Sequence, residues 1–186
     1  MKIEPTSLPG CYRIQPRVMD DHRGHFVKTF QASIFRAHGL EDRFTETFYS
    51  VSRKGVLRGF HFQTPPHAHA KLVHCTAGAV LDAVVDIRRG SPTASQFFTL
   101  ELTAEQATML YIPAGFAHAF YALTDHAAVA YQVTTEFAPD HDAGVRWDSF
   151  GIPWPDRAPI LSAKDLALPH WRDYATPFTM ADALRD

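Results

Sequence analysis

The chain has 186 residues, 46% of them hydrophobic, so we expect one domain over residues 1–186 with a sizeable core. A formal net charge of −2, with scattered basic residues, gives no support for a nucleic-acid partner and favours a small molecule. The N-terminus lacks the apolar run of a signal peptide, and no window approaches the roughly 20 apolar residues of a membrane span, so we expect a cytoplasmic protein. Cys11 and Cys75 are too few for a disulfide framework and are expected to be reduced, partly buried thiols.

Short β-branched and aromatic runs dominate the chain, and Gly, Pro and Asp separate them. Many short strands at close spacing favour an all-β sandwich or barrel over alternating strands and helices. The predicted strands cover residues 11–19, 26–30, 44–52, 70–77, 79–87, 96–102, 108–114, 119–123 and 127–137.

Helical signals are few. Residues 31–40 have apolar side chains at helical spacing, with Gly39 as a possible C-cap. Ser162 precedes a short predicted turn of helix at 163–168, which Pro169 closes. The last segment, 175–186, either docks on the body or frays.

Four of the eleven histidines lie between residues 61 and 74. His67 and His69 would share one face of a strand, and with His118 they resemble the metal motif of cupin barrels. No Asp or Glu occurs between residues 62 and 81, however, and the cation Lys71 stands nearby, which suits an anion better than a metal ion. A metal site of these three histidines stays an alternative.

His61 lies between Phe60 and Phe62, so strand alternation places it on the opposite face, with Gln63. With a carboxylate partner, such a histidine could act as an acid or base near neutral pH; alone, it could be structural. Several arginines next to glycines or turns could grip a diphosphate, although each could also be a solvated surface residue. They are Arg23, Arg53, Arg58, Arg88, Arg89 and Arg146.

A set of ordered motifs covers nearly the whole chain. They are 21-DHRGHFVKTF, 55-GVLRGFHFQ, 70-AKLV, 85-VDIRRGSPT, 111-YIPAGFAHAF, 138-APDHDAGVRWD, 151-GIPWP and 161-LSAKD. This set resembles the dTDP-4-dehydrorhamnose 3,5-epimerase family. The resemblance implies a nucleotide-sugar epimerase with a cupin-like double-stranded β-helix, or jelly roll, and a few short peripheral helices. It also implies a homodimer that needs no metal or other cofactor.

The resemblance assigns catalytic roles to four residues. His61 matches the catalytic base, and Asp165 matches the carboxylate that pairs with it. Lys71 matches the lysine that stabilises the enolate, and Tyr131 matches the proton donor on the opposite face. These roles agree with the chemistry. A proton next to a 4-keto group is acidic because the negative charge left on carbon can move onto the oxygen, so the site needs a base for the proton and a positive group at the oxyanion.

The family's substrate contacts map onto a further set of positions, which we expect to bind the nucleotide sugar. They are Arg23, Phe26, Lys28, Glu46, Phe48, Arg58, Gln63, His118, Phe137 and Arg146. Three places depart from the family pattern: Lys28 replaces a glutamate, 46-ETFYS replaces Q-x-N-x-S, and Phe137 replaces an active-site tyrosine. The segment 49-YSVSRKGVLRGFHFQTPPHAHAKLVHC more closely resembles members that act on GDP- or CDP-linked 4-keto sugars, including heptose derivatives. The nucleotide (dTDP, GDP or CDP) and the carbon inverted (C3, C5 or both) therefore stay open.

Three other functions fit parts of the pattern. A metal-dependent cupin oxygenase or isomerase would use His67, His69 and His118. A sugar-nucleotide 3,4-ketoisomerase, or a sugar-nucleotide-binding protein without activity, could share the fold. The epimerase itself would serve the synthesis of deoxy or heptose sugars for a surface polysaccharide or a glycosylated product.

Overall fold

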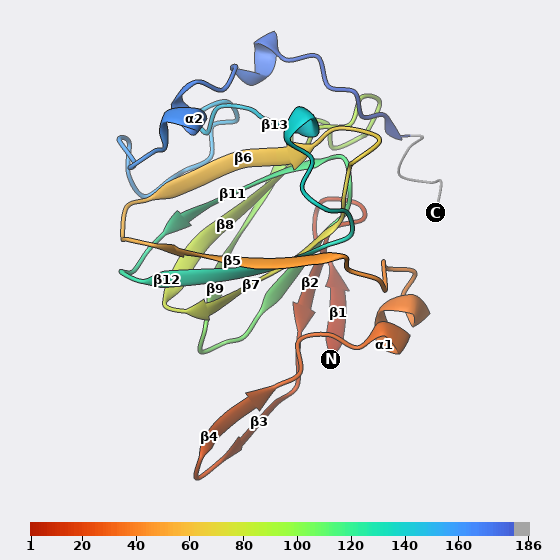
Figure 1. Ribbon diagram of the computed structural model, residues 1–186, viewed down its shortest axis with the longest axis vertical. Helices are drawn as coiled ribbons and strands as arrows, with labels where there is room; N and C mark the ends of the chain where they lie inside the picture. Colours follow the sequence, from red (N-terminus) through yellow and green to blue (C-terminus); the bar gives the residue numbers. More distant parts are fainter. Residues whose placement is uncertain (181–186) are drawn as a thin grey trace.

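The computed structural model describes residues 1–180, and two β-sheets face each other at its centre (Figure 1). One sheet has six strands, in the order β1 (Lys2–Pro5), β2 (Tyr12–Gln15), β10 (Met109–Ile112), β7 (Lys71–Ala77), β12 (Ala127–Val133) and β5 (Glu46–Ser52). The other has five, in the order β13 (Asp142–Gly144), β6 (Leu57–Gln63), β11 (Phe116–Ala122), β8 (Ala79–Asp86) and β9 (Phe97–Thr103). Neighbouring strands are antiparallel. The predicted cupin-like jelly roll is confirmed.

A two-stranded hairpin, β3 (Val18–Asp21) and β4 (Gly24–Val27), projects from this body (Figure 1). We call residues 18–27 the arm. The helices are short and peripheral: α1 (Ala32–Ala37), α2 (Ala163–Leu166) and the 3-10 turns Pro139–His141 and Trp171–Asp173. Among the described residues, no helix is long and apolar enough to cross a membrane.

Three apolar layers hold the sheets in place. The first fills the space between the sheets and includes Val73, Val84, Phe116 and Phe120. A second layer covers the outer face of the six-stranded sheet, where α1 contributes Phe35. In the third, the C-terminal segment covers the outer face of the five-stranded sheet. Phe178 is buried there, so residues 175–180 dock on the body, while the remainder of the predicted tail lies outside the described residues.

The predicted elements differ from the structure mainly at strand ends. The predicted strand 11–19 is divided, since β2 ends before Pro16 and β3 belongs to the arm. Strands β1 and β13 were not predicted; β1 is a charged edge strand and β13 has three residues. Strand β6 is missing from the predicted ranges, although the alternation used for residues 60–63 treats that part of it as a strand. Both helices were correct, with Gly39 at a positive φ of 67° after α1 and the Ser162 side chain capping α2.

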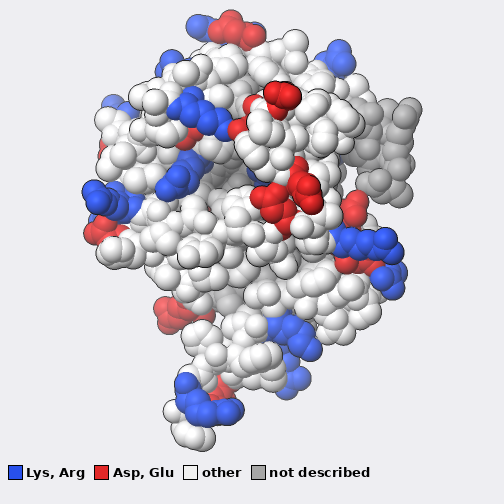
Figure 2. Space-filling model, viewed as in Figure 1, with Lys and Arg blue, Asp and Glu red and all other residues white. Residues whose placement is uncertain are grey.

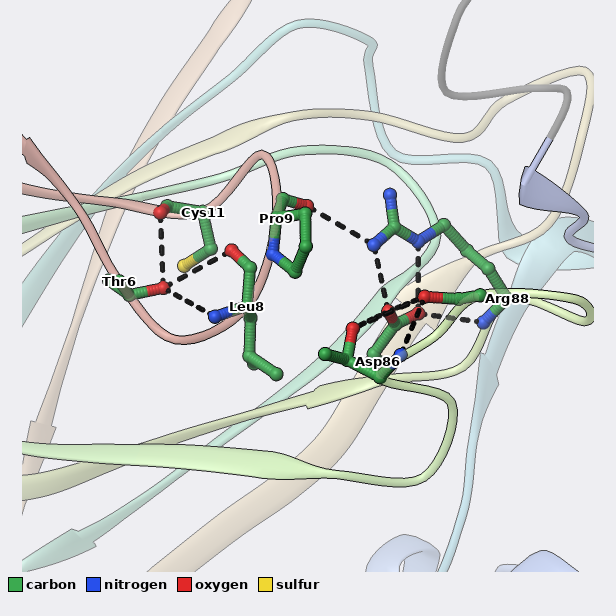
Figure 3. Close-up of polar contacts among 8 residues, drawn as sticks. Thr6, Leu8, Pro9, Cys11, Asp86 and Arg88 are labelled. Carbon is green, nitrogen blue, oxygen red and sulfur yellow. Dashed lines mark hydrogen bonds and ion pairs between the residues drawn. The ribbon is translucent and has the colours of Figure 1, made fainter.

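A buried ion pair joins the end of β8 to the N-terminal turn (Figure 3). The Arg88 guanidinium donates to both oxygens of Asp86 at 2.9 and 2.7 Å and to the Pro9 carbonyl at 3.1 Å. Burial raises the pKa of the Asp86 carboxyl, but hydrogen bonds from Arg88, Ser91 and Thr93 lower it by more, so it stays ionised. Arg88 is thus a structural residue, and its suggested role in gripping a diphosphate was wrong.

Replacing Asp86 should therefore destabilise the fold strongly. Asp86→Ala leaves a guanidinium without its counter-charge in a site where Arg88 is 2% exposed. We expect the free energy of unfolding, measured with a chemical denaturant, to fall by about 3–5 kcal/mol. A loss below about 1 kcal/mol would show that the pair contributes little.

Candidate active site

A cavity of about 400 Å³ opens between the two sheets. Its walls come from β5, β7 and β12 on one side and from β6 and β11 on the other. In Figure 2 the mouth is seen as a hollow, with Lys or Arg side chains on one side and Asp or Glu side chains on the other. Such a mixed rim suits a ligand that carries both an anionic and a hydroxylated part better than a uniformly charged polymer.

His61 reaches the cavity because β6 alternates as the sequence predicts. Phe60 and Phe62 are buried in the outer aromatic layer, while His61 and Gln63 line the cavity, whose wall Phe62 also touches. The Nε2 atom of His61 lies 2.5 Å from Oδ1 of Asp165. Because Nε2 is hydrogen-bonded to this carboxylate, Nδ1 is the ring nitrogen that can take a proton from a substrate.

Asp165 is held in place by the first turn of α2. Its backbone N–H donates to the Ser162 hydroxyl at 3.0 Å, and the residue is only 3% exposed. Burial raises the pKa of the Asp165 carboxyl, but the hydrogen bond and charge of His61 lower it by more. An ionised carboxylate thus orients the imidazole and stabilises any positive charge that it gains.

Lys71 faces this pair from the opposite sheet, at the start of β7. Its ammonium group donates to the His61 carbonyl at 3.1 Å. Burial lowers the pKa of Lys71 to about 8, and the charges of Asp82 and Asp142 oppose that shift. The ammonium is therefore charged at neutral pH and weakly solvated, which strengthens its attraction for a developing oxyanion.

Tyr131, on β12, lies next to the lysine strand on the same sheet. Its ring stacks on Phe48, with ring centroids 4.8 Å apart and planes 15° apart. Burial, with the Asp82 charge adding to it, raises the pKa of the Tyr131 hydroxyl. Tyr131 thus keeps its proton at neutral pH and can donate it.

His118 also lines the cavity and pairs with a residue that sequence reasoning missed. Its Nε2 atom lies 2.8 Å from Oδ2 of Asp82, and both residues are buried. Asp82 gave little signal, because it is one acidic residue within an otherwise apolar strand pattern. Lys164 forms an ion pair with Asp142 at the cavity wall. The lining residues that were not among the predicted catalytic or substrate-binding ones are Ser50, Phe62, His69, Val133, Thr135, Asp142 and Lys164.

The cavity gathers most of the predicted substrate contacts. Glu46 accepts a hydrogen bond from the Phe137 backbone N–H at 2.6 Å, so it holds the segment that carries that ring. The Gln63 amide binds the same segment through the Glu136 carbonyl and the Ala138 N–H. The predicted residues that line the cavity are Glu46, Phe48, Arg58, His61, Gln63, Lys71, His118, Tyr131 and Phe137.

Four predicted contacts lie away from the cavity of their own chain. Arg23, Phe26 and Lys28 belong to the arm or follow it, and Arg23 pairs with Asp21 there. Arg146 is exposed and pairs with Asp148. Of the six arginines considered for a diphosphate, Arg58 alone lines the cavity among the described residues.

The suggested metal ligands are not arranged as the alternative requires. His67 and His69 lie in the loop between β6 and β7 and not on a strand, so the premise of a shared strand face was wrong. The His67 ring packs against His141, with centroids 4.6 Å apart, while His69 faces the cavity. Within residues 1–180, no three His, Cys, Asp or Glu residues are grouped so that they could hold a metal ion.

The geometry favours proton transfer at carbon. A histidine backed by a carboxylate can remove a proton, and a buried ammonium can stabilise the resulting enolate. Because His61 and Tyr131 come from facing sheets, a ring bound between them would present one face to a base and the other to an acid. Such an arrangement can invert a carbon centre.

Comparisons with known proteins agree with this chemistry. The family described as dTDP-4-dehydrorhamnose 3,5-epimerase matches residues 5–173. The chain is 39% identical over 169 residues to the dTDP-4-dehydrorhamnose 3,5-epimerase of Shigella flexneri, with 89% of this chain and 93% of that protein covered. It is 41% identical over 171 residues to the Streptomyces griseus enzyme of that name, with 90% and 85% covered.

Solved structures lead to the same family. The dTDP-6-deoxy-D-glucose-3,5-epimerase of Legionella pneumophila, in complex with dTDP-4-keto-L-rhamnose, has a TM-score of 0.91 and 35% identity, covering 96% of this chain and 98% of that one. A 3'-monoepimerase of Streptomyces bikiniensis, in complex with dTDP-quinovose, has a TM-score of 0.86 and 35% identity, covering 91% and 87%. The chain belongs to the dTDP-4-dehydrorhamnose 3,5-epimerase family and is a nucleotide-sugar epimerase, an isomerase.

Proposed function

We propose that the chain inverts one or both of the carbons that flank C4 in a dTDP-linked 4-keto-6-deoxy sugar. The observation that carries this proposal is the His61–Asp165 pair, which shares one cavity with Lys71 and Tyr131. The relatives named above support dTDP as the nucleotide. They include 3,5-epimerases and one 3'-monoepimerase. The configuration of the sugar that this enzyme produces therefore shows whether one carbon or both are inverted.

The reaction begins with removal of the proton from C3 or C5 by Nδ1 of His61. The electrons of the C–H bond move into the bond with C4, and the C4 oxygen becomes an enolate that the Lys71 ammonium stabilises. Asp165 stabilises the imidazolium that forms. Tyr131 then gives its proton to the same carbon from the other face, the C4 ketone re-forms, and the configuration is inverted. Solvent takes the proton from His61 and returns one to the Tyr131 phenolate, so both groups are restored.

The groups that remain around the cavity position the substrate. Arg58 supplies a cation for the diphosphate; its guanidinium is held by the Ser52 hydroxyl at 3.0 Å. The Phe137 ring is 60% exposed and offers an apolar surface on which the nucleobase of the substrate can stack at the cavity mouth. The chain needs no metal for these steps, and we place it in the cytoplasm, where nucleotide sugars are made.

The arm supports a homodimer in which each chain completes the other's site. A two-stranded hairpin alone is marginally stable in water, and Met19 and Phe26 on this one are 44% and 57% exposed. The resemblance gives Arg23, Phe26 and Lys28 to substrate binding, yet they lie away from the cavity of their own chain. Both facts are explained if the arm lies against the partner's cavity.

His61→Ala should abolish epimerisation and the exchange of the sugar's C3 and C5 protons with deuterated solvent, because the base is lost. We expect a loss of at least about 100-fold. Proton NMR of the dTDP-4-keto sugar in D₂O measures both, and GDP- and CDP-linked substrates in the same assay separate the nucleotides.

His67→Ala serves as the matched control, since this imidazole packs on His141 outside the cavity lining. It should retain near wild-type exchange, whereas a metal site would need it. Full-rate exchange by His61→Ala would remove His61 from its role.

Activity should fall as pH rises through about 8, since the buried Lys71 ammonium loses its proton there. Below that pH the charged form stabilises the enolate; above it the neutral amine does not. The pH profile of kcat/KM shows this limb. Lys71→Arg, which stays charged above pH 10, should lower kcat, and its kcat/KM should no longer fall as the pH rises through about 8. An unchanged limb in Lys71→Arg would assign it to another group.

Mixing two inactive variants should restore activity if the arm serves the partner. A His61→Ala chain paired with a Phe26→Ala chain forms one intact site, made of the second chain's His61 and the first chain's arm. Random mixing then gives about a quarter of wild-type activity. No recovery after dissociation and reassociation would mean that each arm serves its own chain or no site.

A further inference from the structure

A second carboxylate–histidine pair borders the cavity through His118, and the steps above leave it unused. Asp82 lies on β8 and His118 on the neighbouring strand β11. His118 is opposite Val84 and Asp82 is opposite Phe120, so the two side chains are diagonal neighbours on the inner face of the sheet. The pair is deeply buried: Asp82 is 0% and His118 is 4% exposed.

Only one carboxylate oxygen of Asp82 has a hydrogen-bond partner among the described residues, and a residue kept for fold stability would be expected to have both oxygens paired. Oδ2 accepts from Nε2 of His118 at 2.8 Å, but Oδ1 is buried without a hydrogen-bond partner among the described residues. An unpaired carboxylate oxygen in an apolar interior destabilises a protein. Asp86, four residues along the same strand, contrasts with it, because Arg88, Ser91 and Thr93 bind both of its oxygens.

The groups near Asp82 are those of the proposed reaction. Its charge counters the effect of burial on the pKa of Lys71, and it adds to burial in raising the pKa of Tyr131. Both effects keep these side chains in the protonated forms that the mechanism needs. His118, which Asp82 touches directly, lines the same cavity.

We infer that Asp82 is a positioning residue for the epimerisation, acting through His118. This inference rests on the proposed function. The carboxylate binds the Nε2–H, so the ring cannot rotate or change tautomer without breaking a buried hydrogen bond. Nδ1 is thereby presented to the sugar at a fixed place, on the sheet that also carries His61.

Asp82→Asn tests the role, because it removes the charge and keeps the shape. We expect kcat to fall about 10- to 100-fold, with KM changed less than about threefold. In a His118→Gln background the same change should alter kcat less than about threefold, since the group through which Asp82 acts is gone.

Asp86→Asn is the matched control: it neutralises another fully buried carboxylate of β8 outside the cavity lining. It should lower Tm but leave kcat and KM unchanged below the melting temperature. An Asp82→Asn enzyme that behaves in this same way would overturn the inference, as would an unreduced effect in the His118→Gln background. Wild-type turnover tests the proposed function, whereas the ratios between variants test Asp82.

A measurement on the wild-type protein keeps the inference testable if Asp82→Asn does not fold. Nitrogen-15 NMR of the histidine rings, with the His118 signals assigned from His118→Gln, reports which ring nitrogen carries a proton. We expect a proton on Nε2 of His118 across neutral pH. An Nδ1–H tautomer with a bare Nε2 would contradict the inference.

Discussion

The hydrogen bond between His61 and Asp165 joins residues that are 104 positions apart in the chain, and the site depends on it. The bond forms because the C-terminal segment returns across the outer face of the five-stranded sheet (Figure 1). There Phe60, the residue before the histidine, packs edge-on against Phe150 and also contacts Trp154. The aromatic layer behind β6 thus fixes the position of the carboxylate, and the Ser162 cap orients it.

The second constraint is the separation of roles between two sheets. Strand alternation sends Phe60 outward and His61 inward, while on the facing sheet Lys71 and Tyr131 point into the same space. The core between the sheets occupies the rest of the interior, so the cavity is the place where apolar filling gives way to charged groups. An acid and a base on opposite walls are a consequence of the jelly roll, and epimerisation uses that consequence.

Sequence reasoning found the fold class and most of the cavity lining. Alternation alone placed His61 on the face opposite its neighbouring phenylalanines. Tyr131 and Asp165 needed the family resemblance, because a buried tyrosine on a strand and an aspartate in a helical turn are common without any catalytic role. Asp82 was missed since its partner, His118, lies 36 residues away and no local pattern joins them. The strand β6 was also absent from the predicted strands, because the arginine, histidine and glutamine that face the cavity or solvent interrupt its apolar pattern.

The arginines also show what sequence spacing could not predict. Arg23, Arg88 and Arg146 have similar sequence surroundings to Arg58, yet each is neutralised by a nearby aspartate. Whether a cation faces a ligand or an ion-pair partner depends on convergence in space, which spacing along the chain does not report. Arg58 differs because its neighbours are the Ser52 hydroxyl and a backbone carbonyl, which leave its charge uncompensated.

Where solvent hydrogen enters the product tests the account most directly. Wild-type enzyme would convert a dTDP-4-keto-6-deoxy sugar in D₂O, and NMR would locate the deuterium. Proton removal by one wall and return from the other predicts deuterium at each inverted carbon next to C4 and none at C2. An inverted carbon that retains its original hydrogen would contradict the account.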